Sequence, residues 1–199
     1  TGYAGQELVA LLLRHPAFEL RFATSEAEAG EAVPGASLAG APLRYVRASD
    51  APLGEADVVF SCLPSGESAP WALAAREAGA RVVDLSADLR GASHAIYGLP
   101  ELWREEVRGA ALVANPGCYP TGVLLALAPA LRGGLLDPGR PVVVDAASGV
   151  TGAGRTARRD LLFGEVAEDY RAYGVGNRHR HVPELAAGLA RLGGGSAPP

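Results

Sequence analysis

The sequence predicts an α/β fold built on a parallel sheet. Apolar strands are expected at residues 57–63, 81–85 and 110–114, with helices at residues 71–78 and 121–131. Strands and helices that alternate in this way are typical of a doubly wound parallel sheet. A glycine turn at residues 1–5 leads the series and runs directly into a helix, because residues 8–14 have helical apolar spacing.

The remaining predicted elements divide the chain into two domains. They are a strand at 19–23, a short strand near 44–46 inside the otherwise irregular stretch 24–52, a strand at 141–146, a helical segment near 157–167 and a helix at 183–192. The pattern changes near Asn115, so a sheet domain is expected over residues 1–115 and an α+β domain over residues 116–199. We expect the chain to be an internal piece of a longer protein, whose first strand and C-terminal part lie outside it.

Composition excludes several classes of function. The chain has 199 residues, 48% of them hydrophobic, which suits one or two globular domains with a core. A net charge of -4 without a basic block predicts no nucleic-acid partner and no membrane partner. Two cysteines, Cys62 and Cys118, make no disulfide framework and favour a reducing, cytoplasmic compartment. All 18 basic residues are arginines, which excludes a P-loop or Schiff-base lysine within this stretch.

The most informative segment is ANPGCYPTGV, residues 114–123. A short apolar strand ends in an Asn-Pro-Gly turn, and Pro120 then stands in the first turn of a helix. Cys118 is therefore expected at a helix N-terminus, where free N–H groups and the positive end of the dipole favour a thiolate. The alternative is a small buried cysteine at a strand end. The pattern favours a nucleophile.

The chain opens on the tail of a glycine-rich turn, formed by Thr1, Gly2, Tyr3, Ala4 and Gly5. Such turns let backbone N–H groups approach a pyrophosphate at a helix N-terminus. An acid usually ends the second strand and binds the ribose 2′-OH. Thr24 and Ser25 stand there instead, which favours NADP, although Glu26 follows. Ser61 and Pro64 end another strand on the same edge and are candidates for the adenosine half, with a plain turn as the alternative.

Two loops in the second half carry further candidates. The first holds the predicted cofactor or nicotinamide contacts Ser148, Gly149, Gly152 and Ala153. Arg155 follows them, and its guanidinium is a candidate to bind an anionic group. A flexible loop is the alternative.

The second loop carries the run His179-Arg180-His181, just before a helix that starts near Pro183. A metal site is disfavoured because ligand spacing is lacking and neighbouring arginines repel a cation. The better interpretation is a histidine acid–base group that works with Cys118 beside arginines for an anionic substrate. A solvated basic turn is the alternative.

Six motifs follow one another in a recognisable order: TGYAGQEL, DLSADLR, YGLPEL, VANPGCYPTG, SGVTGAGR and HRHVPE. Together they resemble the N-acetyl-γ-glutamyl-phosphate reductases of arginine biosynthesis, relatives of aspartate-semialdehyde dehydrogenase. The motif around Cys118 is highly specific and the glycine turn is not. Cys62 departs from the pattern, because relatives usually carry an apolar or small residue there.

The resemblance implies a Rossmann-type NADP-binding domain, a catalytic domain and a homo-oligomer. It implies that the Cys118 thiolate attacks an acyl phosphate and that NADPH reduces the resulting thioester. His179 is the candidate acid–base group, because it matches the family position, with His181 as the alternative. Helix-end N–H groups near Cys118 would stabilise the oxyanion. The expected substrate-binding residues are Asn115, Arg155, Arg180, His181 and Glu184.

Three alternatives stay open at this stage. The nearest is a reductase of a related carrier-linked 2-aminoadipyl phosphate in lysine biosynthesis. A nucleotide-sensing relative without turnover is disfavoured, because both Cys118 and His179 are present. A cysteine hydrolase is disfavoured by the glycine turn at the start of the βαβ series.

Overall fold

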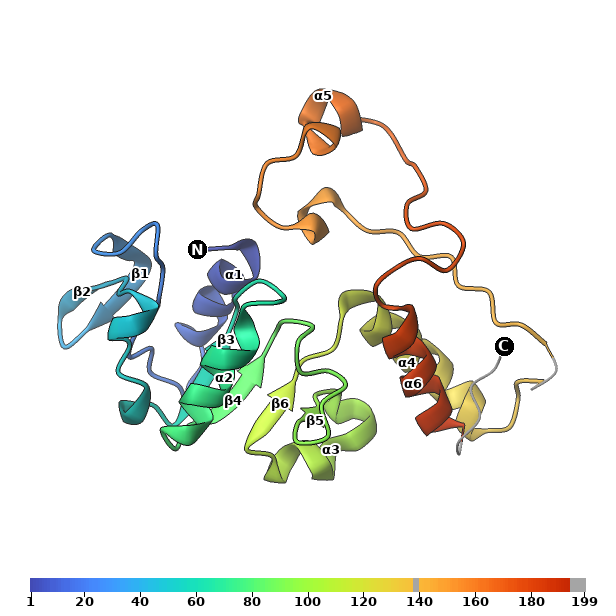
Figure 1. The fold of residues 1–199 in the computed structure, drawn as a ribbon, viewed down its shortest axis with the longest axis horizontal. Helices are drawn as coiled ribbons and strands as arrows, with labels where there is room; N and C mark the ends of the chain where they lie inside the picture. The colour runs from blue at the N-terminus through green and yellow to red at the C-terminus, as the bar shows by residue number, and fades with distance from the viewer. Residues whose placement is uncertain (138–139, 194–199) are drawn as a thin grey trace.

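The structure is a computed structural model that describes residues 1–137 and 140–193. Its centre is a four-stranded sheet with strand order β3-β4-β6-β5 (Figure 1). The strands are β3 (Val58–Ser61), β4 (Arg81–Asp84), β5 (Ile96–Tyr97) and β6 (Leu112–Ala114). All three pairings are parallel, which confirms the predicted α/β class.

Parallel pairing brings the ends of three strands to one edge of the sheet. In the register, Ser61 lies beside Asp84 and Asp84 beside Ala114. The chain continues from Ala114 into the turn before Cys118, and the Asn115 N–H donates to the Asp84 carbonyl at 2.8 Å. Ligands of open α/β sheets bind outside the carboxyl ends of the strands. The cysteine turn therefore lies at the edge where a site is expected.

Helices pack against this sheet through small side chains. Helix α1 (Tyr3–Leu12) follows the glycine turn, and helix α2 (Ser68–Glu77) contacts β3 and β4. Ala72 and Ala75 of α2 are fully buried against Val82 and Leu112, so the helix approaches the sheet closely. Helix α3 (Pro100–Gly109), which the sequence interpretation missed, begins with a proline at its first turn and contacts β5.

Two longer helices form a second core beside the sheet. Helix α4 (Cys118–Arg132) packs on α6 (Val182–Leu192), and Leu124, Leu189 and Leu99 share one buried cluster. Both helices were predicted from their apolar spacing, although α4 starts earlier than expected. In the described part of residues 116–199 no strand forms, and residues 194–199 of the predicted second domain lie outside the described residues.

The stretch 24–52 contains a hairpin, so the prediction of irregular chain there is wrong. Strand β1 (Ala32–Leu38) pairs antiparallel with β2 (Ala41–Arg44). Ala39 and Gly40 both adopt positive φ between the strands, as tight hairpin turns require. Val33, Leu43 and Tyr45 bury one side of the hairpin. The Ala, Gly and Pro content of this stretch gives a low strand propensity. The hairpin forms because its apolar side chains are buried by the rest of the fold.

Two predicted strands do not form. Next to residues 19–23 the only pairing among the described residues is an isolated parallel bridge between Thr24 and Val46. Residues 141–146 have no partner strand in the described chain, and Val143 is 88% exposed. An apolar sequence becomes a strand only where another strand accepts its backbone hydrogen bonds.

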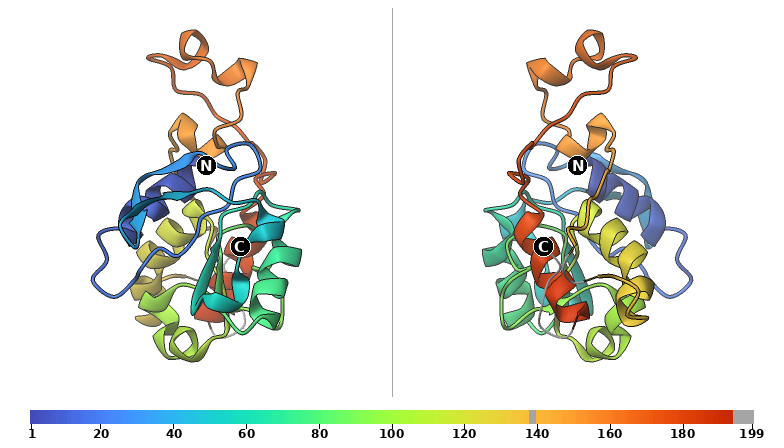
Figure 2. Two further views of the ribbon diagram at one scale, coloured as in Figure 1. Left: turned by 90° about the vertical axis from the view of Figure 1, so that its left-hand side faces the viewer. Right: turned by 90° about the vertical axis from the view of Figure 1, so that its right-hand side faces the viewer.

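The predicted helix at 157–167 is also wrong in extent. Only the 3₁₀ turn Arg159–Leu161 and the short helix α5 (Phe163–Val166) form. This part of the chain stands away from the body (Figures 1 and 2). Phe163 is 85% exposed, so little packing is available to stabilise a longer helix. Other 3₁₀ turns lie at Ala48–Asp50, Leu53–Glu55 and Val150–Ala153.

The α4–α6 contact generates a stability prediction. A Cβ added at Gly188 would meet the Leu124 side chain at 2.7 Å, and Leu124 has no exposed surface into which it can move. We expect Gly188→Ala to lower the free energy of unfolding by about 1–3 kcal/mol. Gly122→Ala in α4 is the control, because nothing lies within 4 Å of its added Cβ and alanine favours the helix. Equal denaturant midpoints for the two variants would contradict the close approach.

Candidate active site

Cys118 is the first residue of α4, and Gly117 is the N-cap. No side chain caps this helix and no acid lies in its first turn, so the first N–H groups are available to a thiolate or an oxyanion. Pro116 and Gly117 are buried, whereas Cys118 is exposed. The strand-turn-helix arrangement thus presents the thiol to solvent at a helix N-terminus.

Three aromatic side chains gather beside the thiol. The hydroxyls of Tyr119 and Tyr173 are 2.5 Å apart, and the His179 ring stands edge-on to both tyrosines, with centroid distances of 5.0 and 5.5 Å. Desolvation, the hydrogen bond with Tyr119 and the nearby charge of Cys118 raise the pKa of Tyr173 to about 12. Tyr173 therefore stays protonated at neutral pH and can donate a hydrogen bond.

His179 is held in one tautomer by the backbone. The N–H of His181 donates to Nδ1 of His179 at 3.2 Å, so Nδ1 is unprotonated and the neutral ring carries its proton on Nε2. Gly174, with φ of +60°, leaves room behind the ring, because a Cβ there would lie 3.3 Å from the His179 Cβ. The arrangement directs a single N–H away from the loop backbone.

His181 occupies a different environment from His179. It is 3% exposed, and three of its ring atoms lie 2.6–2.9 Å from where a Cβ on Gly117 would stand. Its Nε2 is 3.5 Å from Nη1 of Arg90, while its Nδ1 has no hydrogen-bond partner within the described residues. Burial lowers the pKa of His181, so the ring is neutral at pH 7.

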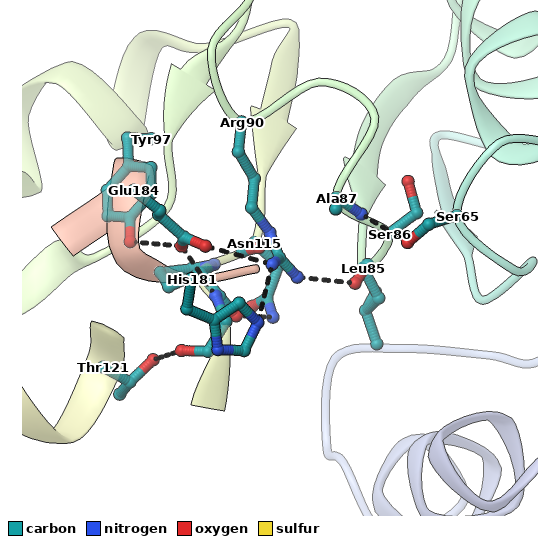
Figure 3. A network of polar contacts seen from close by, with 12 residues as sticks. Ser65, Leu85, Ser86, Ala87, Arg90, Tyr97, Asn115, Thr121, His181 and Glu184 are labelled. Atoms are coloured by element: carbon teal, nitrogen blue, oxygen red, sulfur yellow. Dashed lines mark hydrogen bonds and ion pairs between the residues drawn. The ribbon is translucent and has the colours of Figure 1, made fainter. Parts of the chain in front are cut away.

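Glu184 lies at the centre of a buried polar network (Figure 3). Its carboxylate accepts hydrogen bonds from the Tyr97 hydroxyl at 2.6 Å, the Gly117 N–H at 2.8 Å and Nη1 of Arg90 at 3.1 Å. Burial and the bond to Glu184 raise the pKa of Tyr97. Glu184, expected at the substrate, thus has three hydrogen-bond donors within the protein.

The glycine turn forms the second part of the site. Gly2 is the N-cap of α1, without a side-chain cap and with no acid in the first turn, so N–H groups are available there to a phosphate. A cavity of about 900 Å³ opens beside this turn. Its lining includes most of the predicted cofactor residues of the first domain: Thr1, Gly2, Gly5, Thr24, Ser25, Ser61 and Pro64. Tyr3 and Ala4 are exposed on the first turn of the helix and do not line it.

Two hydroxyls expected to contact the cofactor are bonded within the protein. The Ser61 hydroxyl is 2.6 Å from that of Ser68, which donates to buried Asp84 at 2.5 Å. The Ser25 hydroxyl accepts from the Glu28 N–H at 3.1 Å. These bonds fix the carboxyl edge of the sheet and the turn after Thr24.

The loop at 148–155 reaches from Tyr173 to the glycine turn. At one end Ser148 makes a side-chain hydrogen bond with Tyr173. At the other end Arg155 donates to the Thr1 carbonyl at 2.8 Å and lies 3.4 Å from Glu28. Arg155, expected at the substrate, thus lies at the glycine turn. Gly149, Gly152 and Ala153 between these ends are exposed, as is Arg180 of the histidine loop.

Four residues of the site were not assigned roles from the sequence: Arg90, Tyr97, Tyr119 and Tyr173. Arg90 and Tyr97 belong to the motifs DLSADLR and YGLPEL, so the motifs were a usable signal. Tyr173 had no signal in the sequence, because only the folded loop brings it to Tyr119.

Within residues 1–137 and 140–193, no group of three His, Cys, Asp or Glu side chains is placed to hold a metal. No described helix is both long and apolar enough to cross a bilayer.

Family comparisons agree with this geometry. Residues 1–110 match the family described as "Semialdehyde dehydrogenase, NAD binding domain". The chain belongs to the semialdehyde dehydrogenase family. Residues 118–198 match the "Semialdehyde dehydrogenase, dimerisation domain". The family assignment makes the cavity beside the glycine turn part of a nicotinamide-dinucleotide domain.

The chain is similar to individual members of the semialdehyde dehydrogenase family. N-acetyl-gamma-glutamyl-phosphate reductases of Moorella thermoacetica and Halorhodospira halophila are 44% and 47% identical over 98% of this chain. The resemblance drawn from the six motifs is thereby confirmed. The chain spans 62% of the length of these two relatives. Aspartate semialdehyde dehydrogenase II of Vibrio cholerae, in complex with ASA, is 25% identical with a TM-score of 0.52, covering 61% of this chain and 40% of its own.

The two cysteines are expected to differ in reactivity. Cys62 is exposed in the wall of the cavity, where partial desolvation raises the pKa of its thiol to about 11. Cys118 lies at an uncapped helix N-terminus, which favours the thiolate. One equivalent of iodoacetamide at pH 7.5 should therefore alkylate Cys118 first, as peptide mapping can measure. In Cys118→Ser only slow labelling should remain. Preferential labelling of Cys62 would contradict the assignment.

Proposed function

We propose that the complete protein reduces N-acetyl-γ-glutamyl phosphate to N-acetylglutamate semialdehyde and phosphate, with NADPH as the reductant. The observation that carries this proposal is the loop at 148–155, which joins the surroundings of an exposed helix-end thiol to a dinucleotide turn. Hydride transfer to a covalently held acyl group needs those two sites side by side. The substrate is proposed from the relatives, which are N-acetyl-gamma-glutamyl-phosphate reductases.

The thiol performs the covalent part of the reaction. The Cys118 thiolate attacks the acyl carbon, the carbon–oxygen bond to phosphate breaks, and phosphate leaves with that electron pair. A thioester remains on Sγ. The free N–H groups of the first turn of α4 stabilise the oxyanion of this step and of the reduction that follows. The hemithioacetal then collapses, the carbon–sulfur bond breaks, and the thiolate is regenerated.

His179 is proposed as the proton donor in this sequence. Its Nδ1 already accepts the His181 N–H, so the proton available for chemistry is the one on Nε2. That N–H can donate to the carbonyl oxygen as negative charge develops, and recover its proton when the hemithioacetal collapses. The free N–H groups of the first turn of α4 can stabilise the negative charge on the attacking sulfur. Asn115, Arg180 and Arg155 remain candidates for the anionic ends of the substrate.

The glycine turn is proposed to hold the cofactor. Gly2 and the N–H groups of the first turn of α1 fit a pyrophosphate, and the Arg155 guanidinium lies beside them. When bound, the nicotinamide supplies the hydride for the thioester. The loop residues Ser148, Gly149, Gly152 and Ala153 are proposed to border the nicotinamide, because their loop runs from this turn towards Cys118.

NADP is proposed over NAD because Glu26, the acid that follows Thr24 and Ser25, already has partners within the protein. Glu26 accepts the Ala48 N–H at 2.9 Å and lies 3.7 Å from the Arg47 guanidinium. These contacts compete with a hydrogen bond from the ribose 2′-OH, and the Arg47 guanidinium beside Glu26 is proposed as the cation for a 2′-phosphate. The proposal extends to a homo-oligomer, for which the dimerisation-domain match is the support, and to a cytoplasmic location.

The proposed reaction is tested in reverse on the full-length protein. N-acetylglutamate semialdehyde and NADP⁺ should form NADPH only when phosphate is present, followed by absorbance at the reduced nicotinamide band. Cys118→Ser should lower turnover by several orders of magnitude, because a serine hydroxyl provides no comparable anion. Cys62→Ser should retain turnover. Undiminished phosphate-dependent NADPH formation by Cys118→Ser would contradict the mechanism.

Cofactor choice is tested by direct binding. The full-length protein should bind NADPH more tightly than NADH, and Arg47→Ala should weaken NADPH binding by about tenfold, or about 1.4 kcal/mol, while leaving NADH unchanged. Arg44→Ala is a matched control, because Arg44 is also exposed but donates to the Gly30 carbonyl. Equal or tighter NADH binding by the wild type would mean that Glu26 governs the pocket.

A further inference from the structure

Two buried side chains hold the peptide groups on either side of the cysteine turn. The Glu184 carboxylate accepts the Gly117 N–H at 2.8 Å, and Nε of Arg90 donates to the Asn115 carbonyl at 2.9 Å. Arg90 comes from the loop after β4 and Glu184 from the first turn of α6. The turn is therefore fixed by two elements to which it is not adjacent in sequence.

The two side chains also bind each other. Nη1 of Arg90 lies 3.1 Å from Glu184, and their side chains are only 12% and 10% exposed. The remaining groups have partners, because Tyr97 donates to Glu184 at 2.6 Å and Nη2 of Arg90 donates to the Leu85 carbonyl at 3.2 Å. A buried pair with its hydrogen bonds satisfied permits one arrangement and penalises others.

Gly117 is enclosed on its other sides as well. The Thr121 hydroxyl donates to its carbonyl at 2.9 Å. The His181 ring covers its α-carbon so closely that no side chain fits there. Both polar groups of Gly117 and its α-carbon are thus in contact with fixed partners. Cys118 follows directly, so its backbone has little freedom.

We propose that Arg90 and Glu184 are positioning residues for the nucleophile: their ion pair fixes the turn at residues 115–117 so that the first N–H groups of α4 point at the Cys118 thiolate. Neither residue needs to touch the substrate for this role. The inference deepens the proposed function and relies on it only for the kinetic part of the test below. Alkylation of Cys118 tests the positioning without assuming any substrate.

The experiment compares two replacements of Glu184 in the full-length protein. Glu184→Gln removes the charge but keeps an oxygen that can accept the Gly117 N–H, whereas Glu184→Ala removes both. The charge is lost in both variants. The difference between their alkylation rates therefore measures the effect of the hydrogen bond to the Gly117 N–H. The second-order rate constant for iodoacetamide at Cys118 is measured at pH 7, per folded molecule, with the folded fraction taken from circular dichroism.

We expect Glu184→Ala to alkylate about tenfold more slowly than Glu184→Gln, because only the glutamine keeps an acceptor for the Gly117 N–H that holds the turn. Glu105→Ala is the matched control, because Glu105 pairs with Arg108 at 2.8 Å on the exposed surface and should leave the rate unchanged. Equal alkylation rates per folded molecule in the Gln and Ala variants would overturn the proposal and leave Glu184 a purely structural residue.

Steady-state kinetics provide the second readout. A positioning residue should lower kcat while the KM for the semialdehyde stays within about twofold, because ground-state binding is untouched. A rise in KM at constant kcat would overturn the proposal and assign Glu184 to the substrate. The wild type could show no phosphate-dependent turnover while Glu184→Ala is still alkylated more slowly than Glu184→Gln. That result would refute the proposed reaction and support the positioning role, so failure of the reaction is distinguishable from failure of the positioning role.

Discussion

The hydrogen bond from the Gly117 N–H to the Glu184 carboxylate is the contact on which the site depends. Glu184 collects donors from three places in the chain: β5 through Tyr97, the loop after β4 through Arg90, and the turn before α4. One carboxylate thereby joins the parallel sheet to the α4–α6 pair. Its loss would leave these buried donors without their acceptor, an outcome more costly than the average gain from a hydrogen bond.

In the proposed reaction the chemistry is divided between two helix N-termini. Helix α4 presents Cys118 with free N–H groups, and α1 presents Gly2 with free N–H groups for a phosphate. The loop at 148–155 connects their surroundings, through Tyr173 at one end and the Thr1 carbonyl at the other. The His179 ring stands edge-on to Tyr119, the residue after Cys118, in a tautomer set by the loop backbone. The division explains why an exposed cysteine and a glycine turn belong to one site.

Much of this arrangement could be predicted from local sequence. The turn before Cys118 was predictable because Asn-Pro-Gly has few allowed conformations, and the strands β3, β4 and β6 because their apolar runs have no helical period. The hairpin at residues 32–44 was not predictable, because burial of Val33 and Tyr45 decides it rather than local propensity. The strand expected at 141–146 does not form, for the opposite reason. Its sequence has a high strand propensity, but no partner strand lies beside it in the described chain.

The roles of His181 and Glu184 could not be deduced from spacing alone. A histidine and a glutamate near a cysteine look the same in sequence whether they face a substrate or the protein interior. Burial of His181 against Gly117 and the three donors on Glu184 distinguish the two cases. Those contacts depend on residues almost a hundred positions away along the chain, such as Arg90.

The central claim is that Cys118 carries the acyl group during the reaction. Incubating the full-length protein with N-acetylglutamate semialdehyde and NADP⁺, without phosphate, should stop the reverse reaction at the thioester. Intact-mass measurement and peptide mapping should then find one N-acetylglutamyl group per chain, on Cys118, and added phosphate should release it. An acyl group on Cys62, or NADPH formed in one equivalent with no acyl group on Cys118, would contradict the account.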